Sequence, residues 1–363
     1  MPFERGAFTL TIFELPGELP EELARPLANR HAGTLDEVTG EPQVGWVAGR
    51  CLLDTAIDEE SIQRGTFYHF ALRQAVRKIP SALLNALCKR EERLRMKAQN
   101  LTFIGSKIRK QIKEEIVEKH IQRMPPTLSA VPAVLAPHEK LLFVGTSGGN
   151  QLDLFIDNFY QTFKQEPLQF TPGLILEREF QRTAADFPSL DLGAGDGGDP
   201  AIGRDFLMFL WFYGETVGKF VHPQYGDFDV MIEGPLVFAG SGEERGAGET
   251  SLRRGDSPLR SAEAKAALEV GKKLKRAKLT VTRGEEIWSG VFDPDNFAFG
   301  SFSVPEGEKL DEEEAFIERM ESVVTFKTVL TEYFKLFVEA MSPEKRADTE
   351  KKIREWIRNR DAI

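Results

Sequence analysis

Hydrophobic residues recur in short runs along the first half of the chain, and these runs predict strands. The runs cover residues 8–15 (FTLTIFEL), 44–54, 66–79, 131–136 and 140–145. Aromatic and β-branched residues dominate them, and both types favour the half-buried surface of a sheet. The turn sequence PHEK joins the last two runs, so they predict a hairpin. A second hairpin is predicted at 279–292, with Arg283 and Gly284 at its turn.

Apolar residues that recur every three or four positions predict helices. The predicted helices cover residues 21–33, 81–100, 106–122, 150–163, 261–277, 312–341 and 343–363. Gly105 separates the two helices of the pair at 81–122, and Pro125 and Pro126 stop the second because proline cannot continue a helix. The helix at 343–363 carries mixed charge and is expected to be peripheral.

Two glycine-rich, acidic segments at 190–203 and 240–249 predict mobile surface loops. The whole pattern predicts a mixed α/β chain of the α+β type, with antiparallel sheets and a helical arm. The expected divisions are an N-terminal α/β region at 1–170 that includes the arm at 81–124, a C-terminal α/β region at 171–341, and a helical tail at 342–363.

Composition narrows the class of protein. A chain of 363 residues with 41% hydrophobic residues can bury a sizeable core and is expected to form more than one domain. Its longest bulky apolar run, FLMFLWFY at 206–213, is less than half of a membrane span and is predicted to be core. The first ten residues lack the pattern of a secretory signal. The two cysteines, Cys51 and Cys88, form no metal or disulfide motif, so the cytoplasm is the expected compartment.

Charge is segregated along the chain, although the formal net charge is only −10. Residues 73–123 hold fourteen Lys and Arg against five Glu, and residues 252–283 hold ten basic against three acidic residues. These two basic islands carry +9 and +7, so the rest of the chain carries −26. The net charge therefore hides two cationic segments in an acidic protein.

Helical geometry predicts that each basic island sorts its charges from its apolar residues. In the first helix of the arm, one face is predicted to hold Leu84, Leu87, Cys88, Leu94 and Ala98, and the opposite face Lys89, Arg90, Arg93 and Lys97. In the second helix, the predicted buried face holds Ile104, Ile108, Ile112 and Ile116, one flank Arg109, Lys110 and Lys113, and the other Glu114 and Glu118. In the helix expected at 261–277, Lys265, Lys272 and Arg276 share a stripe beside Lys273, and Ala267, Val270 and Leu274 face the core.

Sorted charges favour a polyanionic partner over a merely solvated helix surface. A solvated helix gains from Glu and Lys placed four residues apart, which would intersperse the signs. Like charges on one stripe repel each other unless an anion neutralises them, and a phosphate backbone is the simplest such anion. Lipid headgroups fit less well, because the apolar faces are needed for the core and leave no wedge for a membrane.

A resemblance to a known family supports this interpretation. The succession of a strand, VRKIPSALLNALCKREERLRMKAQ, a second basic helix ending in RMPP, a hairpin with KLLFVGTS and an amphipathic helix is similar to the RdgC family of bacterial recombination-associated proteins. The segment SAEAKAALEVGKKLKRAKLTVTRGEEIWSGVFDPDNFAFGSFSV and the acidic helix after it are similar to that family too. The likeness covers most of residues 1–341.

The resemblance implies an elongated, horseshoe-shaped subunit that forms a homodimeric ring around duplex DNA. It implies DNA binding without sequence preference, restraint of RecA-dependent recombination by occupying the DNA, and a place in the cytoplasm or nucleoid. The family's basic stretches match Lys89, Arg90, Arg93, Lys97, Lys107, Arg109, Lys110, Lys113, Arg253, Arg254 and Lys272, and the charge pattern adds Lys265, Lys273 and Arg276. The resemblance places a tip after the second arm helix, where the family can carry an aromatic residue that closes the ring. This chain reads MPPTL there, with Leu128 at the nearest position.

Two other classes of function stay open. The loop VGTSGGNQ at 144–151 lies between a predicted strand and helix but lacks the lysine of a phosphate-binding P-loop. The sequence FDPDNF offers Asp293 and Asp295 to a metal-dependent DNA-processing enzyme, although Asp-Pro is also ordinary turn chemistry. A dimer that docks an acidic protein partner is the other alternative. No cofactor, no metal and no enzymatic activity are predicted.

Overall fold

We describe residues 2–192, 201–240, 248–253, 258–307 and 311–360 in a computed structural model of the chain. The chain divides into two compact units. Unit 1 comprises residues 1–19, 63–68 and 132–363, and unit 2 comprises residues 20–62 and 69–131. The division predicted at residue 170 followed composition along the chain, whereas contacts group the first residues with those beyond 132. Most of the glycine-rich segments at 190–203 and 240–249 lies outside the described residues, as does Arg254.

Unit 1 is built on antiparallel strands in the order β10-β9-β11-β12-β13-β1-β6-β5. Short strands β7 and β8 pair with β1 and β9. The bounds are β1 (Phe8–Glu14), β3 (Gln63–Arg64), β5 (Pro126–Ala136), β6 (Leu141–Val144), β7 (Leu168–Gln169), β8 (Lys219–His222), β9 (Gly226–Ala239), β10 (Glu249–Leu252), β11 (Lys273–Arg283), β12 (Glu286–Asp293) and β13 (Ala298–Ser303). The predicted hairpins β5-β6 and β11-β12 are confirmed, and so is the mixed α/β class with a large antiparallel sheet.

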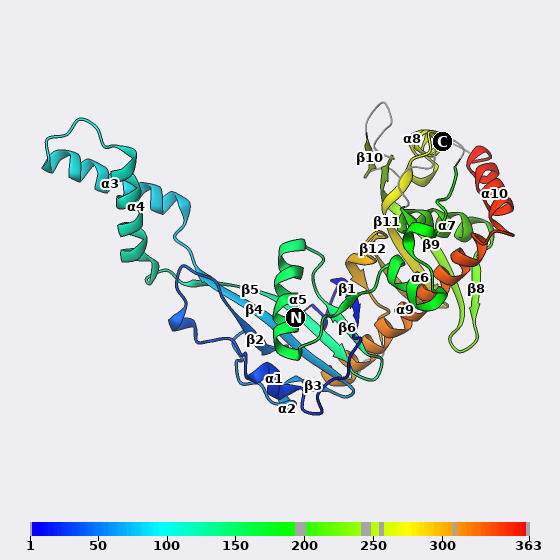
Figure 1. Cartoon of the computed structure of the whole chain (residues 1–363), viewed down its shortest axis with the longest axis horizontal. Helices are drawn as coiled ribbons and strands as arrows, with labels where there is room; N and C mark the ends of the chain where they lie inside the picture. Colours follow the sequence, from blue (N-terminus) through cyan, green and yellow to red (C-terminus); the bar gives the residue numbers. More distant parts are fainter. Residues whose placement is uncertain (1, 193–200, 241–247, 254–257, 308–310, 361–363) are drawn as a thin grey trace. The chain divides into compact units, whose positions relative to one another are not determined.

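The helices of unit 1 cover its strands and complete a core rich in phenylalanine (Figure 1). They are α5 (Gly149–Phe163), α6 (Pro172–Phe180), α7 (Ile202–Thr216), α8 (Ala262–Glu269), α9 (Glu312–Ala340) and α10 (Arg346–Arg358). Every residue from Phe206 to Trp211 in α7 is buried, which confirms the core prediction for this run. The N-cap of α9 is Asp311, whose carboxylate accepts hydrogen bonds from the backbone amides of Glu313 and Glu314 at 2.9 Å.

The helix predicted at 261–277 is wrong beyond Glu269. α8 ends there, Gly271 adopts a left-handed φ of 82°, and β11 starts at Lys273. β11 pairs on both sides, with β9 and β12, so its backbone hydrogen bonds are satisfied in a sheet. Val270, expected to face the core, is 52% exposed. The predicted cationic helix stripe therefore does not exist.

The C-terminal helix α10 forms as predicted, but it is not peripheral. Ile353 and Ile357 are buried in the core of unit 1. Trp356 meets Trp211 of α7 edge to face, with ring centroids 5.4 Å apart. The mixed charge of this helix hid a narrow apolar stripe, which two isoleucines and one tryptophan are enough to build.

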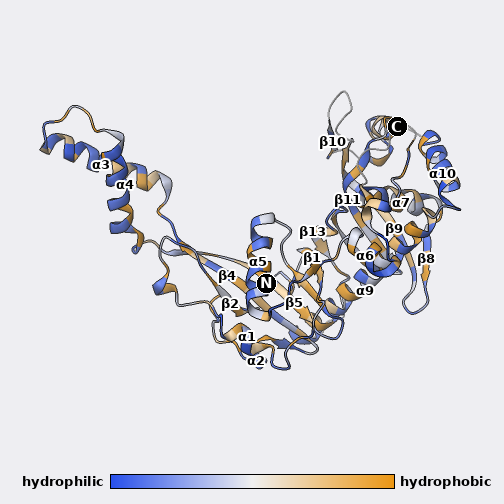
Figure 2. Ribbon diagram, in the orientation of Figure 1, coloured by the Kyte–Doolittle hydropathy of each residue, from blue (hydrophilic) through white to orange (hydrophobic). Residues whose placement is uncertain are grey.

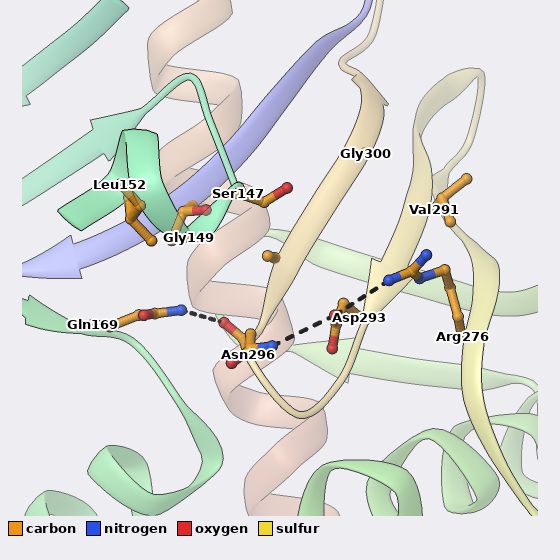
Figure 3. A pocket seen from close by; sticks show the side chains of 11 residues that line it. Ser147, Gly149, Leu152, Gln169, Arg276, Val291, Asp293, Asn296 and Gly300 are labelled. Atoms are coloured by element: carbon orange, nitrogen blue, oxygen red, sulfur yellow. Dashed lines mark hydrogen bonds and ion pairs between the residues drawn. The ribbon is translucent and has the colours of Figure 1, made fainter. Parts of the chain in front are cut away.

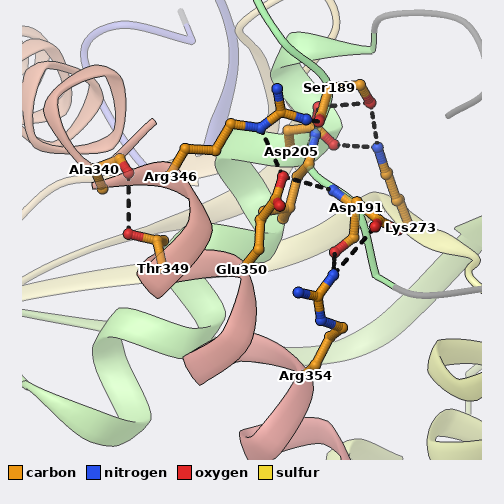
Figure 4. Close-up of polar contacts among 10 residues, drawn as sticks. Ser189, Asp191, Asp205, Lys273, Ala340, Arg346, Thr349, Glu350 and Arg354 are labelled. Carbon is orange, nitrogen blue, oxygen red and sulfur yellow. Dashed lines mark hydrogen bonds and ion pairs between the residues drawn. The ribbon is translucent and has the colours of Figure 1, made fainter. Parts of the chain in front are cut away.

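A polar cluster joins α7, β11, α10 and the segment that precedes α7 (Figure 4). Asp205 is fully buried, and its carboxylate lies 2.5 Å from the ammonium of Lys273. Lys273 also donates a hydrogen bond to Ser189 at 2.7 Å. Arg354 of α10 pairs with Asp191 at 3.1 Å. Burial raises the pKa of Asp205, and the neighbouring ammonium of Lys273 opposes that rise.

Unit 2 combines strands with a pair of long helices, which Figure 1 shows extending beyond the strand ends. Its elements are α1 (Ala24–Ala28), β2 (Gln43–Ala48), α2 (Glu59–Ile62), β4 (Phe67–Arg77), α3 (Ser81–Ala98), α4 (Ser106–Ile121) and the first half of β5. β2 and β4 are antiparallel, with Trp46 opposite Leu72. α3 and α4 confirm the predicted arm, and the predicted helix at 21–33 is a single short turn at α1.

Arg77 fastens the base of the arm to the rest of unit 2. Its guanidinium donates hydrogen bonds to the carbonyls of Val38 at 2.8 Å, Leu35 at 2.9 Å and Gln122 at 3.4 Å, and to that of Met124. Gln122 and Met124 follow α4 directly. Arg77 therefore belongs to the first basic island by sequence but has a structural role.

Replacing Arg77 by Gln should loosen this attachment. The four carbonyls that accept hydrogen bonds from Arg77 would lose their charged donor. We expect unit 2 to lose about 2 kcal/mol of stability, because hydrogen bonds to charged groups contribute about 1.5–3 kcal/mol. Limited proteolysis should cut near residues 122–124 faster than in the wild type. An unchanged cleavage rate there would contradict the role of Arg77.

His69 makes the stability of unit 2 sensitive to acid. Its side chain is buried, and burial, helped by the charge of Arg50, lowers its pKa from 6.5 to about 3. Between pH 6.5 and 3 the unfolded chain therefore binds a proton that the folded chain does not, so stability falls as the pH falls. We expect a loss of about 2 kcal/mol between pH 6.5 and 5, at about 1.4 kcal/mol per pH unit.

Urea unfolding at a series of pH values checks this expectation. A His69→Gln variant supplies the control, because glutamine does not titrate and its stability should lack this slope. If both proteins show the same slope in this range, the acid sensitivity has another source.

Candidate nucleic-acid interface

The arm is a helical hairpin with a small core of its own. Ile104, Ile112 and Ile116 are buried between the helices. The side chains that pack against them are Leu84, Leu87, Cys88 and Met96. Figure 2 shows that the rest of both helices is predominantly hydrophilic. The apolar surface is thus narrow, and most of each helix is left to polar side chains.

Three positions of the predicted apolar faces are exposed instead. Leu94 is 55% exposed, Ile108 is 37% exposed, and Ala98 is exposed as well. The centre of the α3 face is occupied by Arg95, which pairs with Glu91 at 3.2 Å on its own helix and with Glu115 of α4. Arg95 and its ion pairs therefore occupy the part of the α3 face that was predicted to be apolar, and Leu94 lies at the edge of the contact between α3 and α4.

The end of α3 is fixed by a left-handed cap. Asn100 has a φ of 49°, a conformation that asparagine tolerates better than most residues. The amide of Leu101 donates to the carbonyl of Met96 at 2.9 Å, and the amide of Asn100 to that of Lys97 at 3.5 Å. This pair of bonds is a Schellman motif, which brings Leu101 back over Met96. The arm tip is therefore the segment 99–105.

The arm carries a set of exposed cations with no acidic side chain within ion-pair distance among the described residues. They are Lys89, Arg90, Arg93, Lys97, Lys107 and Lys113. The two other predicted arm cations have weak partners, since Arg109 lies 3.8 Å from Glu92 and Lys110 lies 3.8 Å from Glu114. These six unpaired cations, named the arm cations below, form the strongest candidate site for a polyanion.

The second basic island is engaged within unit 1. Lys273 is held by buried Asp205, and Lys265 donates to the carbonyls of Arg358 and Arg360 at 3.3 and 2.9 Å. Lys272 donates to the Thr250 hydroxyl at 3.0 Å, and Arg253 to that of Ser251 at 3.0 Å. Arg276 lies 3.6 Å from Asp293.

Two other lysines of β11 form ion pairs with glutamates of the neighbouring strands. Lys275 pairs with Glu249 of β10 and Lys278 with Glu233 of β9, both at 2.9 Å. Antiparallel pairing places these acidic residues beside β11 although they lie far away in the sequence. The two islands predicted as one DNA-binding surface therefore differ. Eight of the nine described cations of residues 252–283 have a carboxylate or a neutral oxygen partner in unit 1, whereas the six arm cations of the first island have no ion-pair partner among the described residues.

The loop at 144–151 helps to line a pocket of about 450 Å³ (Figure 3). Ser147 and Gly149 face it from the start of α5, and Arg276 and Asp293 lie across it. No lysine lines this pocket, and its one arginine points at Asp293. The pocket thus lacks the lysine with which a P-loop holds phosphates.

The two carboxylates of FDPDNF lie in separate ion pairs. Asp293 faces Arg276, and Asp295 lies 2.9 Å from Arg204. The described part of the chain contains no group of three His, Cys, Asp or Glu side chains that could hold a metal ion. The geometry gives no support to a metal-dependent nuclease at these aspartates.

Leu128 does not lie at the tip of the arm. It belongs to β5, which starts at Pro126, and its side chain is partly buried. The expectation that MPPTL forms the tip is wrong, because the chain returns to the strands directly after α4. The residues that form the tip, Leu101 and Phe103 among them, were not singled out from the sequence. The signal available was Asn100 at a helix end, followed by two apolar residues.

No known protein family and no curated protein matches the chain. Within the described residues, no helix is long and apolar enough to cross a membrane.

Proposed function

We propose that the protein binds DNA without sequence preference through the arm cations. The observation that carries the proposal is the contrast between the two basic islands. Five cations of the second island pair with carboxylates of unit 1 and three more are held by neutral oxygens, whereas six on the arm have no ion-pair partner among the described residues. Like charges repel one another, so a phosphate backbone that neutralises them lowers their electrostatic energy. Contacts to phosphates carry no sequence information.

The residues of the arm suit this role in a second way. Its core uses Ile104, Ile112 and Ile116 between α3 and α4, and its cations are spread over both helices rather than gathered at one point. A row of cations matches the spaced charges of a nucleic-acid backbone better than it matches a single small anion. Acidic residues elsewhere would repel DNA from other surfaces.

The resemblance to the RdgC family extends the proposal. It adds a homodimeric ring that encloses duplex DNA, restraint of RecA-dependent recombination by occupying that DNA, and association with the nucleoid. These additions rest on the likeness of sequence order, and the DNA-binding proposal does not depend on them.

Binding of the wild-type protein to a labelled duplex of random sequence tests the proposal. We expect binding that is equal for several unrelated sequences and that weakens steeply with salt, with a dimer detected by mass in the same samples. Absence of binding at low salt would contradict the proposal and would favour an acidic protein partner for the arm. Cleavage of the DNA in the presence of Mg²⁺ would favour the enzymatic alternative.

A further inference from the structure

The tip of the arm exposes apolar side chains that its small core does not use. Leu94, Leu101 and Phe103 are 55, 41 and 69% exposed. A hollow of about 570 Å³ opens beside the end of α3. Its walls include the apolar side chains of Leu94, Met96 and Leu101 and the cations Arg90, Arg93 and Lys97.

This combination selects for a particular ligand chemistry. An apolar floor alone would suit any hydrophobic segment, and cations alone would suit any polyanion. Arg90, Arg93 and Lys97 belong to the unpaired arm cations, so the rim of the hollow attracts negative charge. A nucleotide joins an apolar, planar base to an anionic phosphate over a distance that such a hollow spans.

Phe103 adds an aromatic surface to the tip. The guanidinium of Arg109 lies 5.6 Å from the centre of its ring, while the ring remains largely exposed. Stacking on aromatic rings and on arginine is how many proteins hold the bases of single strands. Inside a duplex the bases already stack on one another, so their faces are not available to such a ring.

We infer that the arm tip binds unpaired nucleotides of a single DNA strand. Bases lie against Leu101 and Phe103, and phosphates lie on the three cations of the hollow. This inference rests on the proposed function and deepens it, because it assigns duplex affinity to the arm cations in general and single-strand preference to the tip.

The test compares two DNA probes with one variant. The probes are a short single strand that contains the fluorescent base 2-aminopurine and a relaxed, covalently closed circular duplex, which has no ends. The variant is Leu101→Ala with Phe103→Ala in the full chain. The matched control is Leu53→Ala with Tyr160→Ala, which removes another exposed leucine and another exposed aromatic ring, 60 and 53% exposed, outside the arm.

We expect the tip variant to lose about tenfold in affinity for the single strand, because each stacked base contributes a factor of about 5 to 150. Its affinity for the circle and the salt dependence of that binding should stay within about twofold of the wild type. The change of 2-aminopurine fluorescence on binding should shrink in the tip variant alone. The control variant should match the wild type on both probes.

Several results would overturn the inference while leaving duplex binding intact. One is an unchanged affinity for the single strand, and another is an equal loss on both probes. A loss of dimer mass in the tip variant, with unchanged DNA affinities, would assign the tip to a protein contact instead. If the wild type binds neither probe, the proposed function itself fails.

Discussion

Reversing four arm cations should weaken DNA binding about 1000-fold near 0.1 M salt, since each neutralised phosphate releases counterions. The variant is Arg93→Glu, Lys97→Glu, Lys107→Glu and Lys113→Glu in one chain. All four side chains are exposed and none has an ion-pair partner among the described residues, so the fold should tolerate the change. The slope of log affinity against log salt should become less steep by about 3 to 4.

A variant of equal charge change separates the arm from a general effect of net charge. Lys275, Lys278, Lys345 and Lys352 are lysines of unit 1 that each face a carboxylate. Their reversal to Glu should change the affinity for duplex DNA by less than about tenfold. Equal losses in both variants would show that the arm has no special role.

Removing the ammonium of Lys273 should cost about 3–5 kcal/mol of stability, the usual cost of breaking one half of a buried ion pair. In a Lys273→Met variant, Asp205 keeps the amide of Leu190 at 3.0 Å and the hydroxyl of Ser189 at 3.2 Å, but it loses its counter-charge. Urea unfolding at pH 7 measures the loss. The pKa of Asp205, already raised by burial, should rise further, so the deficit should shrink as the pH falls.

Two further variants make this prediction specific. Lys275→Met removes a neighbouring lysine of β11 whose partner Glu249 is exposed, and it should cost less than about 1 kcal/mol. Lys273→Met combined with Asp205→Asn leaves no unpaired charge and should recover most of the lost stability. A deficit in Lys273→Met that does not depend on pH would mean that packing, and not charge, explains the loss.

Helices and strands were predicted correctly from the sequence where the spacing of hydrophobic residues stays the same along the whole element. Both arm helices, α9 and the hairpin β11-β12 were found because one period runs through each. The junction at 261–277 failed for a specific reason. β11 has irregular register on both sides of Arg276, so Leu274 and Ala277 both face the core although they are three residues apart. Apolar residues three positions apart are also typical of a helix, so the predicted helix was extended from α8 into β11.

The candidate site was predictable only in part. Exposure of the arm cations followed from helical geometry, because the opposite faces contain isoleucine and leucine. The ion pairs of the second island did not, because Asp205, Glu233 and Glu249 lie 26 to 68 positions before their partners and meet them only once α7, β9 and β10 pack beside β11. Charge counts along a chain cannot show which cations find partners across strands.

The ion pairs of β11 also affect how far the protein's field reaches. A lysine beside a glutamate is a dipole, and its potential falls off with distance faster than that of a single charge. Beyond about 8–10 Å, the screening length in physiological salt, such pairs contribute almost nothing. Residues 81–124 contain eleven Lys and Arg against five Glu, a surplus of +6 in a chain of −10. Under the proposed function, an approaching polyanion should therefore be attracted first by the arm, where six described cations have no ion-pair partner, and capture should begin there before any close contact forms.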